Sequence, residues 1–341
     1  MNEREYHFDN LCGIFVLYMI FIVHIPAHCD IKDNLYHNHL LLLLDCFMGW
    51  FFFKSGMYYK KKPVVSALKS DFRRLLIPYF FFNGLGAIVD IILIMNKTND
   101  YTLYSLLRDP FMHTLYHEAT TGNQAIWFLL SLFVVRILYN ILDSIHIKPI
   151  AIAIITIILA YYLYTNIQSN ANSACFTIIG YNIYVPYYFG NILFGMSFYS
   201  MGVSLKSTQI NNYVFLFSFF IYFFHFFFPH YMDVRTNEPH TDYSLATFFC
   251  LSGILFYNNL SYHFMNKKIA LINYIGQNSM IFYCTHFIII RFISELSFFH
   301  ILTPFEKIIV LASVTILALK LSDIVFHKKR FSILVGTKCT F

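Results

Sequence analysis

Charged side chains are scarce in this sequence. Asp, Glu, Lys and Arg supply only 12% of its 341 residues, whereas about 25% is usual for a soluble domain. Hydrophobic residues supply 58%, and the mean hydropathy is +0.57. We therefore expect a lipid bilayer, rather than water, to surround most of the fold.

Closely spaced cysteines are also missing. The seven cysteines are scattered, and none forms a CxxC pair, so neither a disulfide framework nor a zinc site is predicted. A signal peptide is not indicated either, because the first ten residues carry Glu3, Glu5 and Asp9 against a single Arg4, and no small-x-small cleavage site follows the first apolar run. We expect that run to remain as a helix.

Long apolar runs, by contrast, are abundant. A spanning helix needs about 20 mostly apolar residues. Nothing between the runs resembles a soluble domain, and no clear internal repeat points to an inverted-repeat transporter. The sequence predicts an all-α integral membrane protein, with about ten transmembrane helices in one bundle formed by a single domain over residues 1–341. The predicted helices cover residues 11–28, 39–59, 75–95, 125–143, 149–165, 183–202, 212–228, 244–260, 272–293 and 306–326.

Basic residues gather in alternate loops. Cytoplasmic loops hold the excess of Lys and Arg, so the basic loop after the second predicted helix is placed inside. Alternation then predicts that the N-terminus and C-terminus are both cytoplasmic. Topology thus explains the net charge of +6, and no basic face of a soluble fold remains to indicate nucleic-acid binding. The basic residues predicted inside are Arg4, Lys60, Lys61, Lys62, Lys69, Arg73, Arg74, Lys148, Lys206, Lys267, Lys268, Lys328, Lys329, Arg330 and Lys338.

A few ionisable side chains fall within the predicted spans, where each is costly and therefore a functional hypothesis. His24 stands out, because it lies about 20 Å along a helix that begins near Leu11. Its imidazole suits a general base, although a histidine that only hydrogen-bonds a neighbouring helix is the alternative. His28, one turn further, raises a metal site as a weaker alternative; a third ligand such as Asp45 is needed, and we predict no metal. The full set is His24, Asp45, Lys54, Asp90, Arg136, His225, His286, Arg291, Lys320 and Asp323.

The basic stretch Lys60–Arg74 has two interpretations. It anchors the cytoplasmic side to lipid phosphates, or it cradles an anionic ligand such as the phosphates of a nucleotide-like donor. Charge alone favours anchoring, whereas the sequence that follows, Leu75–Tyr79, favours the cradle.

Five short motifs occur in order along almost the whole chain. They are Asp9 to His24, Phe47–Gly56 (FMGWFFFKSG), Arg73–Tyr79 (RRLLIPY), Ile126–Leu129 (IWFL) and Ile275–His286 (IGQNSMIFYCTH). In order and spacing, the motifs resemble the membrane-bound acyltransferase 3 family, and most of all its fucose 4-O-acetylase-like subgroup.

The resemblance implies an O-acyltransferase in the bacterial cytoplasmic membrane. Its donor would be acetyl-CoA or another short acyl-CoA, as a co-substrate and not a bound cofactor, and its acceptor a sugar hydroxyl of a surface polysaccharide or lipid-linked glycan. The implied residues are His24 as catalytic base; Lys69, Arg73 and Arg74 for donor binding; and Asp45, Trp50, Ser55, Asn278, Ser279 and His286 as candidate substrate or oxyanion contacts. A covalent acyl-enzyme on His24 or a cysteine is an alternative to direct transfer.

Two positions depart from the family pattern. Gly13 stands where the family often has Arg or Lys, eleven residues before its helix-1 histidine. A basic partner for His24 is therefore missing or comes from elsewhere. The family's R-x-x-R pair is also incomplete, since Ser70 stands three residues before Arg73, and Lys69 with Arg73 is the expected substitute.

Two other functions compete with acyl transfer. A polysaccharide or small-molecule translocator of the same fold would use buried His and Asp as a relay or pathway lining. A structural subunit of a glycan-assembly complex would depend on no single intramembrane histidine.

Overall fold

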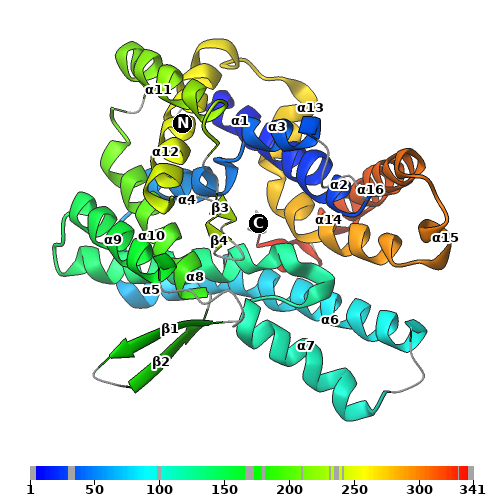
Figure 1. Cartoon of the computed structure of the whole chain (residues 1–341). Helices are drawn as coiled ribbons and strands as arrows, with labels where there is room; N and C mark the ends of the chain where they lie inside the picture. The colour runs from blue at the N-terminus through cyan, green and yellow to red at the C-terminus, as the bar shows by residue number, and fades with distance from the viewer. Residues whose placement is uncertain are drawn as a thin grey trace. The chain divides into compact units, whose positions relative to one another are not determined.

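The structure is a computed structural model that describes residues 5–29, 35–97, 101–165, 173–178, 181–186, 188–208, 210–229, 232–233, 238–239, 242–328 and 330–336. Most of these residues are helical (Figure 1). The α-helices are α1 (Tyr6–Tyr18), α2 (Ile25–Ala27), α3 (Leu35–Leu43), α4 (Phe47–Met57), α5 (Val64–Asp71), α6 (Ile77–Lys97), α7 (Leu103–His117), α8 (Trp127–Ser144), α9 (Pro149–Thr165), α10 (Tyr188–Leu205), α11 (Asn212–His225), α12 (Tyr243–Phe264), α13 (Ala270–Gln277), α14 (Ser279–Ser294), α15 (Ser297–His300) and α16 (Pro304–Phe326).

Short elements of other kinds join these helices. Two are π-helices, η1 (Met19–His24) and η2 (Phe72–Leu76), and two are 3-10 helices, η3 (Thr121–Ile126) and η4 (Ser332–Val335). Two small antiparallel hairpins pair β1 (Ser173–Ile178) with β2 (Tyr181–Pro186), and β3 (Met232–Asp233) with β4 (Glu238–Pro239).

The helical class expected from the sequence is confirmed, and helices occupy all or part of every predicted range. Within the described residues, five helical segments are long and apolar enough to cross a membrane, and three further apolar helices are shorter. The molecule is thus a multi-pass membrane protein, while ten spans and cytoplasmic termini remain predictions. The five segments are Tyr6–Ala27, His39–Met57, Val64–Asn96, Leu103–Ser144 and Pro304–Phe326; the shorter three are Pro149–Tyr164, Asn212–His225 and Ser279–Ser294.

Among the described residues, two helices of at least 8 residues, α5 and α7, lie wholly outside the predicted spans. The α7 helix begins with a capping box, in which the Thr102 side chain accepts from the backbone N–H of Ser105 and the Ser105 hydroxyl accepts from that of Thr102. The charged residues Arg108 and Asp109, which form an ion pair, lower the hydropathy of this helix, so the sequence did not predict it as a span. The basic stretch also becomes helical, because α5 and η2 run directly into α6.

The chain divides into two compact units, each assembled from segments distant in sequence. Unit 1 comprises Met1–Phe8, Leu42–Lys69 and Ser131–Lys268, and unit 2 comprises Asp9–Leu41, Ser70–Leu130 and Ile269–Phe341. In unit 1, α10 packs against α4 and α9, and α11 packs against α12 (Figure 1). In unit 2, α14 packs against α16 and η3, and α6 packs against η3 and α7.

An apolar stripe on α9 has the character of a lipid-facing surface. Ile150, Ile154 and Ile158 are 51%, 53% and 60% exposed. Residues four apart lie on one face of a helix. Because such a stripe is costly in water, its exposure agrees with a membrane-embedded helix.

Glycines allow close contact between α4 and α10 in unit 1. A Cβ atom on Gly56 would lie 2.0 Å from the carbonyl oxygen of Tyr199, and one on Gly202 would lie 2.1 Å from that of Phe53. Small residues that let backbones approach are a main source of helix association in membranes. Reciprocal glycines therefore fix this helix pair.

Alanine at Gly56 or Gly202 should destabilise the protein, since the added methyl group meets a backbone carbonyl that only helix separation can move. We expect a cost of about 1–3 kcal/mol per substitution, measured as a lower midpoint of thermal unfolding in detergent. Gly84→Ala is the matched control, because its Cβ would meet nothing within 4 Å. An unchanged midpoint for Gly56→Ala and Gly202→Ala would contradict the close packing.

Candidate functional site

A π-helical turn in unit 2 carries His24. In η1 (Met19–His24) each helical hydrogen bond spans five residues instead of four. The backbone N–H of Ile25, for example, bonds to the carbonyl oxygen of Ile20. Pro26 follows and cannot donate a helical hydrogen bond, which accounts for a local change of repeat. Such π-turns are frequent at functional sites.

The ring of His24 lies against α14. Its centroid is 5.1 Å from that of His286, with 38° between the ring planes, and 5.1 Å from that of Phe287, in an edge-to-face arrangement. His24 is half-buried, whereas His286 is fully buried. Two candidate residues from opposite ends of the chain are thus neighbours, and His28 adds a more distant ring contact, 5.9 Å from Phe287.

The contacts of His286 define its tautomer. Nδ1 lies 3.0 Å from the carbonyl oxygen of Phe282 and 2.8 Å from that of Tyr283. Carbonyl oxygens only accept hydrogen bonds, so Nδ1 carries the proton and Nε2 of the neutral ring is an acceptor. This Nε2 is buried and has no hydrogen-bond partner among the described residues.

Close packing surrounds Gly13 of α1, the position where the resemblance led us to expect a basic residue. A Cβ atom on Gly13 would lie 2.1 Å from the carbonyl oxygen of Ile272, and one on Gly276 of α13 would lie 1.8 Å from that of Asp9. The two backbones touch, and a lysine or arginine does not fit at position 13. This position therefore supplies no basic partner for His24.

Two further candidates, Asn278 and Ser279, lie at the start of α14. The Asn278 amide donates to the carbonyl oxygen of Tyr274 at 3.0 Å, and its Oδ1 lies 3.1 Å from Nε2 of His327. Asn278 therefore fixes the junction between α13 and α14. Ser279 is half-buried at the first position of α14.

In unit 1, Asp45 occupies the break between α3 and α4. One carboxylate oxygen lies 2.7 Å from Nε2 of the fully buried His225, and the other accepts from the Tyr222 hydroxyl at 3.1 Å. The hydroxyl of Tyr257 lies 2.5 Å from the carbonyl oxygen of Leu43. Side chains of α11 and α12 thus supply hydrogen-bond partners for the polar groups at this helix break.

Removing this carboxylate should destabilise unit 1. Asp45→Ala leaves the His225 nitrogen buried without its partner, and breaking such a pair costs roughly 3 kcal/mol. A fall of about 5 °C or more in the unfolding midpoint in detergent is expected. Asp45→Asn keeps one oxygen to accept from the Tyr222 hydroxyl and places an NH2 group that can donate to a neutral His225 Nε2, so it should lose much less. An unchanged midpoint in Asp45→Ala would show that the contact does not stabilise unit 1.

Trp50 and Ser55 on α4 also have partners within unit 1. The Trp50 indole donates to Oδ1 of Asn258 at 2.7 Å, and the Lys54 ammonium lies 4.9 Å from the centre of the Trp50 ring. Arg136 donates to the Ser55 hydroxyl at 3.1 Å. These contacts explain how two cations are accommodated within apolar helices.

The predicted donor-binding residues lie where helix α5 passes into η2. In η2 the backbone N–H of Ile77 bonds to the carbonyl oxygen of Phe72, and Pro78 follows, as Pro26 follows η1. Arg73 and Arg74 are exposed on this wider turn. Lys69, at the end of α5, is exposed as well.

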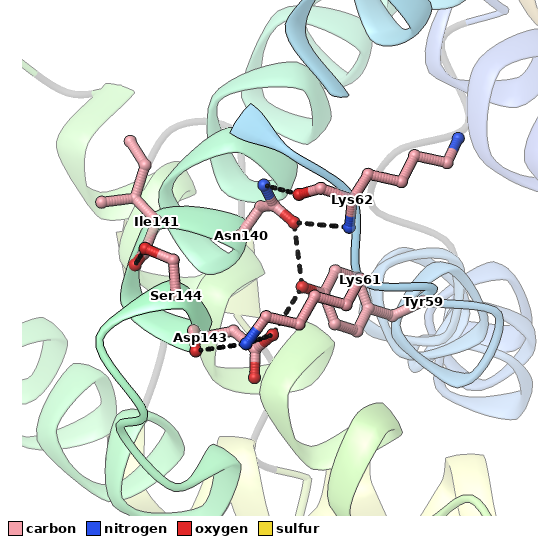
Figure 2. A network of polar contacts seen from close by, with 7 residues as sticks. All are labelled: Tyr59, Lys61, Lys62, Asn140, Ile141, Asp143 and Ser144. Atoms are coloured by element: carbon pink, nitrogen blue, oxygen red, sulfur yellow. Dashed lines mark hydrogen bonds and ion pairs between the residues drawn. The ribbon is translucent and has the colours of Figure 1, made fainter. Parts of the chain in front are cut away.

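A polar network holds the start of the basic stretch to the end of α8 (Figure 2). The Tyr59 hydroxyl lies 2.9 Å from side-chain oxygens of both Asn140 and Asp143, and Lys61 pairs with Asp143 at 3.3 Å. Asn140 also donates to the carbonyl oxygen of Lys62 at 3.0 Å. Burial and the hydrogen bond with Asp143 raise the pKa of Tyr59, which keeps the phenol protonated as a donor.

This network separates the roles of the basic residues. Lys61 pairs with Asp143, whereas Lys69, Arg73 and Arg74 lie further along the chain and are exposed. Sequence patterns did not reveal Tyr59, Asn140 or the His24–His286 pairing, because all three depend on contacts distant in sequence.

Among the described residues, no group of three or more His, Cys, Asp or Glu side chains is arranged to hold a metal ion.

Comparison with known proteins adds the family. No curated protein and no solved structure matches this sequence. The profile of the acyltransferase 3 family, described as an acyltransferase domain, matches residues 6–327 and so includes both units and every predicted site residue. The motif resemblance is thereby confirmed, and the chain belongs to the membrane-bound acyltransferase 3 family.

Proposed function

We propose that this acyltransferase moves an acetyl or other short acyl group from cytoplasmic acyl-CoA to a sugar hydroxyl of a surface glycan or its lipid-linked precursor, in the bacterial cytoplasmic membrane. The observation that carries the proposal is His24, set on a π-turn with its ring 5.1 Å from that of the buried His286. A histidine so placed is suited to take a proton from a hydroxyl.

The proposed step is direct transfer. His24 takes the proton from the acceptor hydroxyl while the hydroxyl oxygen attacks the thioester carbonyl. The new C–O bond forms, the C–S bond breaks, and the CoA thiolate leaves with the proton from His24. The developing oxyanion needs a hydrogen-bond donor. Of the candidates Asn278, Ser279 and His286, Ser279 is the best suited, because the Asn278 amide and the His286 Nδ1–H already bond to backbone carbonyls.

Donor binding is assigned to Lys69, Arg73 and Arg74. Guanidinium groups pair with phosphate oxygens through two parallel hydrogen bonds. Their exposure at the start of α6, on the side that loop charge predicts to be cytoplasmic, supports capture of the CoA phosphates there.

Translocation is the second candidate, and the Asp45–His225 pair favours it. A broken helix with a buried histidine paired to a carboxylate is a feature of transport pathways. The two functions predict different phenotypes. Loss of a translocator lowers the amount of glycan at the surface, whereas loss of the acyltransferase leaves the glycan in place without its ester groups.

The test compares a host strain that lacks the gene with the same strain carrying it on a plasmid. We expect NMR of the purified surface glycan to show O-acyl signals only in the complemented strain, with equal glycan yields. Equal O-acylation in both strains would overturn the proposal, and a loss of glycan from the surface of the deletion strain would favour translocation.

A further inference from the structure

His286 presents its acceptor nitrogen away from its own helix. Its Nδ1–H is occupied by the carbonyl oxygens of Phe282 and Tyr283, one turn earlier on α14. Nε2 lies on the remote edge of the ring, fully buried and without a hydrogen-bond partner among the described residues. A buried polar atom left unsatisfied in this way is costly unless it serves a purpose.

The rings that surround His286 indicate His24 as the partner of Nε2. Three rings lie around His286, those of His24 at 5.1 Å, Tyr283 at 6.2 Å and Phe287 at 6.3 Å. Phe287 has no polar atom, and the Tyr283 hydroxyl already bonds to the carbonyl oxygen of Ala125. His24 is therefore the ring in this group with a nitrogen that becomes a new donor when it is protonated.

We propose that His286 is a positioning residue of the transfer reaction, whose Nε2 accepts a hydrogen bond from the imidazolium that His24 becomes. This inference rests on the proposed function and assigns a partner to its base. When His24 takes the proton of the acceptor hydroxyl, its other ring N–H turns to His286. When that proton leaves with the CoA thiol, both rings are neutral again.

A neutral partner suits this location. Gly13 packs against the backbone of Ile272 and leaves no room for a basic side chain there, and a carboxylate would add a buried charge, which is costly in an apolar environment. An imidazole with a committed Nδ1–H stabilises the imidazolium of His24 without any charge of its own. The same tautomer leaves no N–H on Nε2, so an oxyanion-donor role for His286 fits less well.

Two substitutions separate the two edges of the ring. His286→Asn keeps an amide that reaches the position of Nδ1 but nothing at Nε2, whereas His286→Gln places an amide oxygen near the position of Nε2. In purified protein supplied with labelled acetyl-CoA and glycan acceptor, we expect His286→Asn to lower kcat about 100-fold, with the KM for acetyl-CoA unchanged. We expect His286→Gln to remain within about tenfold of the wild type.

Thr285→Ala is the matched structural control. Thr285 is buried one residue away and bonds to the carbonyl oxygen of Ile281 at 2.8 Å, so its loss removes a similar contact within α14. Wild-type kcat in His286→Asn, or equal losses in the Asn and Gln variants, would overturn the positioning role while wild-type transfer still supports the acyltransferase. A wild-type protein that transfers no label would overturn both.

Discussion

Replacing His24 with alanine should reduce acyl transfer by about 10²- to 10⁴-fold, the usual contribution of a general base. The acceptor hydroxyl then has no group to receive its proton as it attacks the thioester. Binding of acyl-CoA, assigned to other residues, should be unchanged, so the loss falls on kcat. The measurement is the initial rate of label transfer from acetyl-CoA at saturating donor, normalised to the amount of folded protein.

His28→Ala is the control for this prediction. His28 lies one turn beyond His24 and also contacts the ring of Phe287. Because the proposed proton transfer does not use His28, its replacement should change kcat by less than about threefold. Wild-type rates in His24→Ala, or equal losses in the two variants, would rule out His24 as the specific base.

Replacing Arg73 and Arg74 together with alanine should raise the KM for acyl-CoA by about ten- to a hundredfold, with little change in kcat. The pair is expected to bind the CoA phosphates equally in the ground state and the transition state. Both side chains are exposed, so salt should screen the interaction. Higher ionic strength should therefore raise the KM of the wild type more than that of the double variant.

An exposed lysine elsewhere on the predicted cytoplasmic side serves as the control. Lys148→Ala removes one charge from the loop before α9 and should leave the KM unchanged. If the double variant binds acyl-CoA as the wild type does, Arg73 and Arg74 serve only to anchor the helix at lipid phosphates.

Hydropathy predicted most of the helices, because in a membrane protein each long apolar run by itself indicates a helix. It missed α7, where Arg108 and Asp109 lower the apolar character of a capped helix. It also missed the π-turns η1 and η2. These turns depend on backbone geometry that the spacing of apolar residues does not report.

The candidate site was predictable in part. His24 stands out in sequence because a buried histidine is unusual in an apolar helix. The sequence alone does not reveal that His286 is its neighbour, or that Nδ1 of His286 is occupied, since these depend on the packing of α14. Likewise, in the sequence Gly13 indicates only a missing basic side chain, whereas in the structure Gly13 packs closely against the backbone of Ile272.

The most direct test of acyl transfer uses the purified protein in lipid nanodiscs with acetyl-CoA labelled in its acetyl group and a lipid-linked glycan acceptor. The account predicts that the label appears on the glycan as an alkali-labile ester, in step with release of CoA thiol, and that His24→Ala abolishes both. An unlabelled glycan with no release of thiol, from folded wild-type protein, would contradict it.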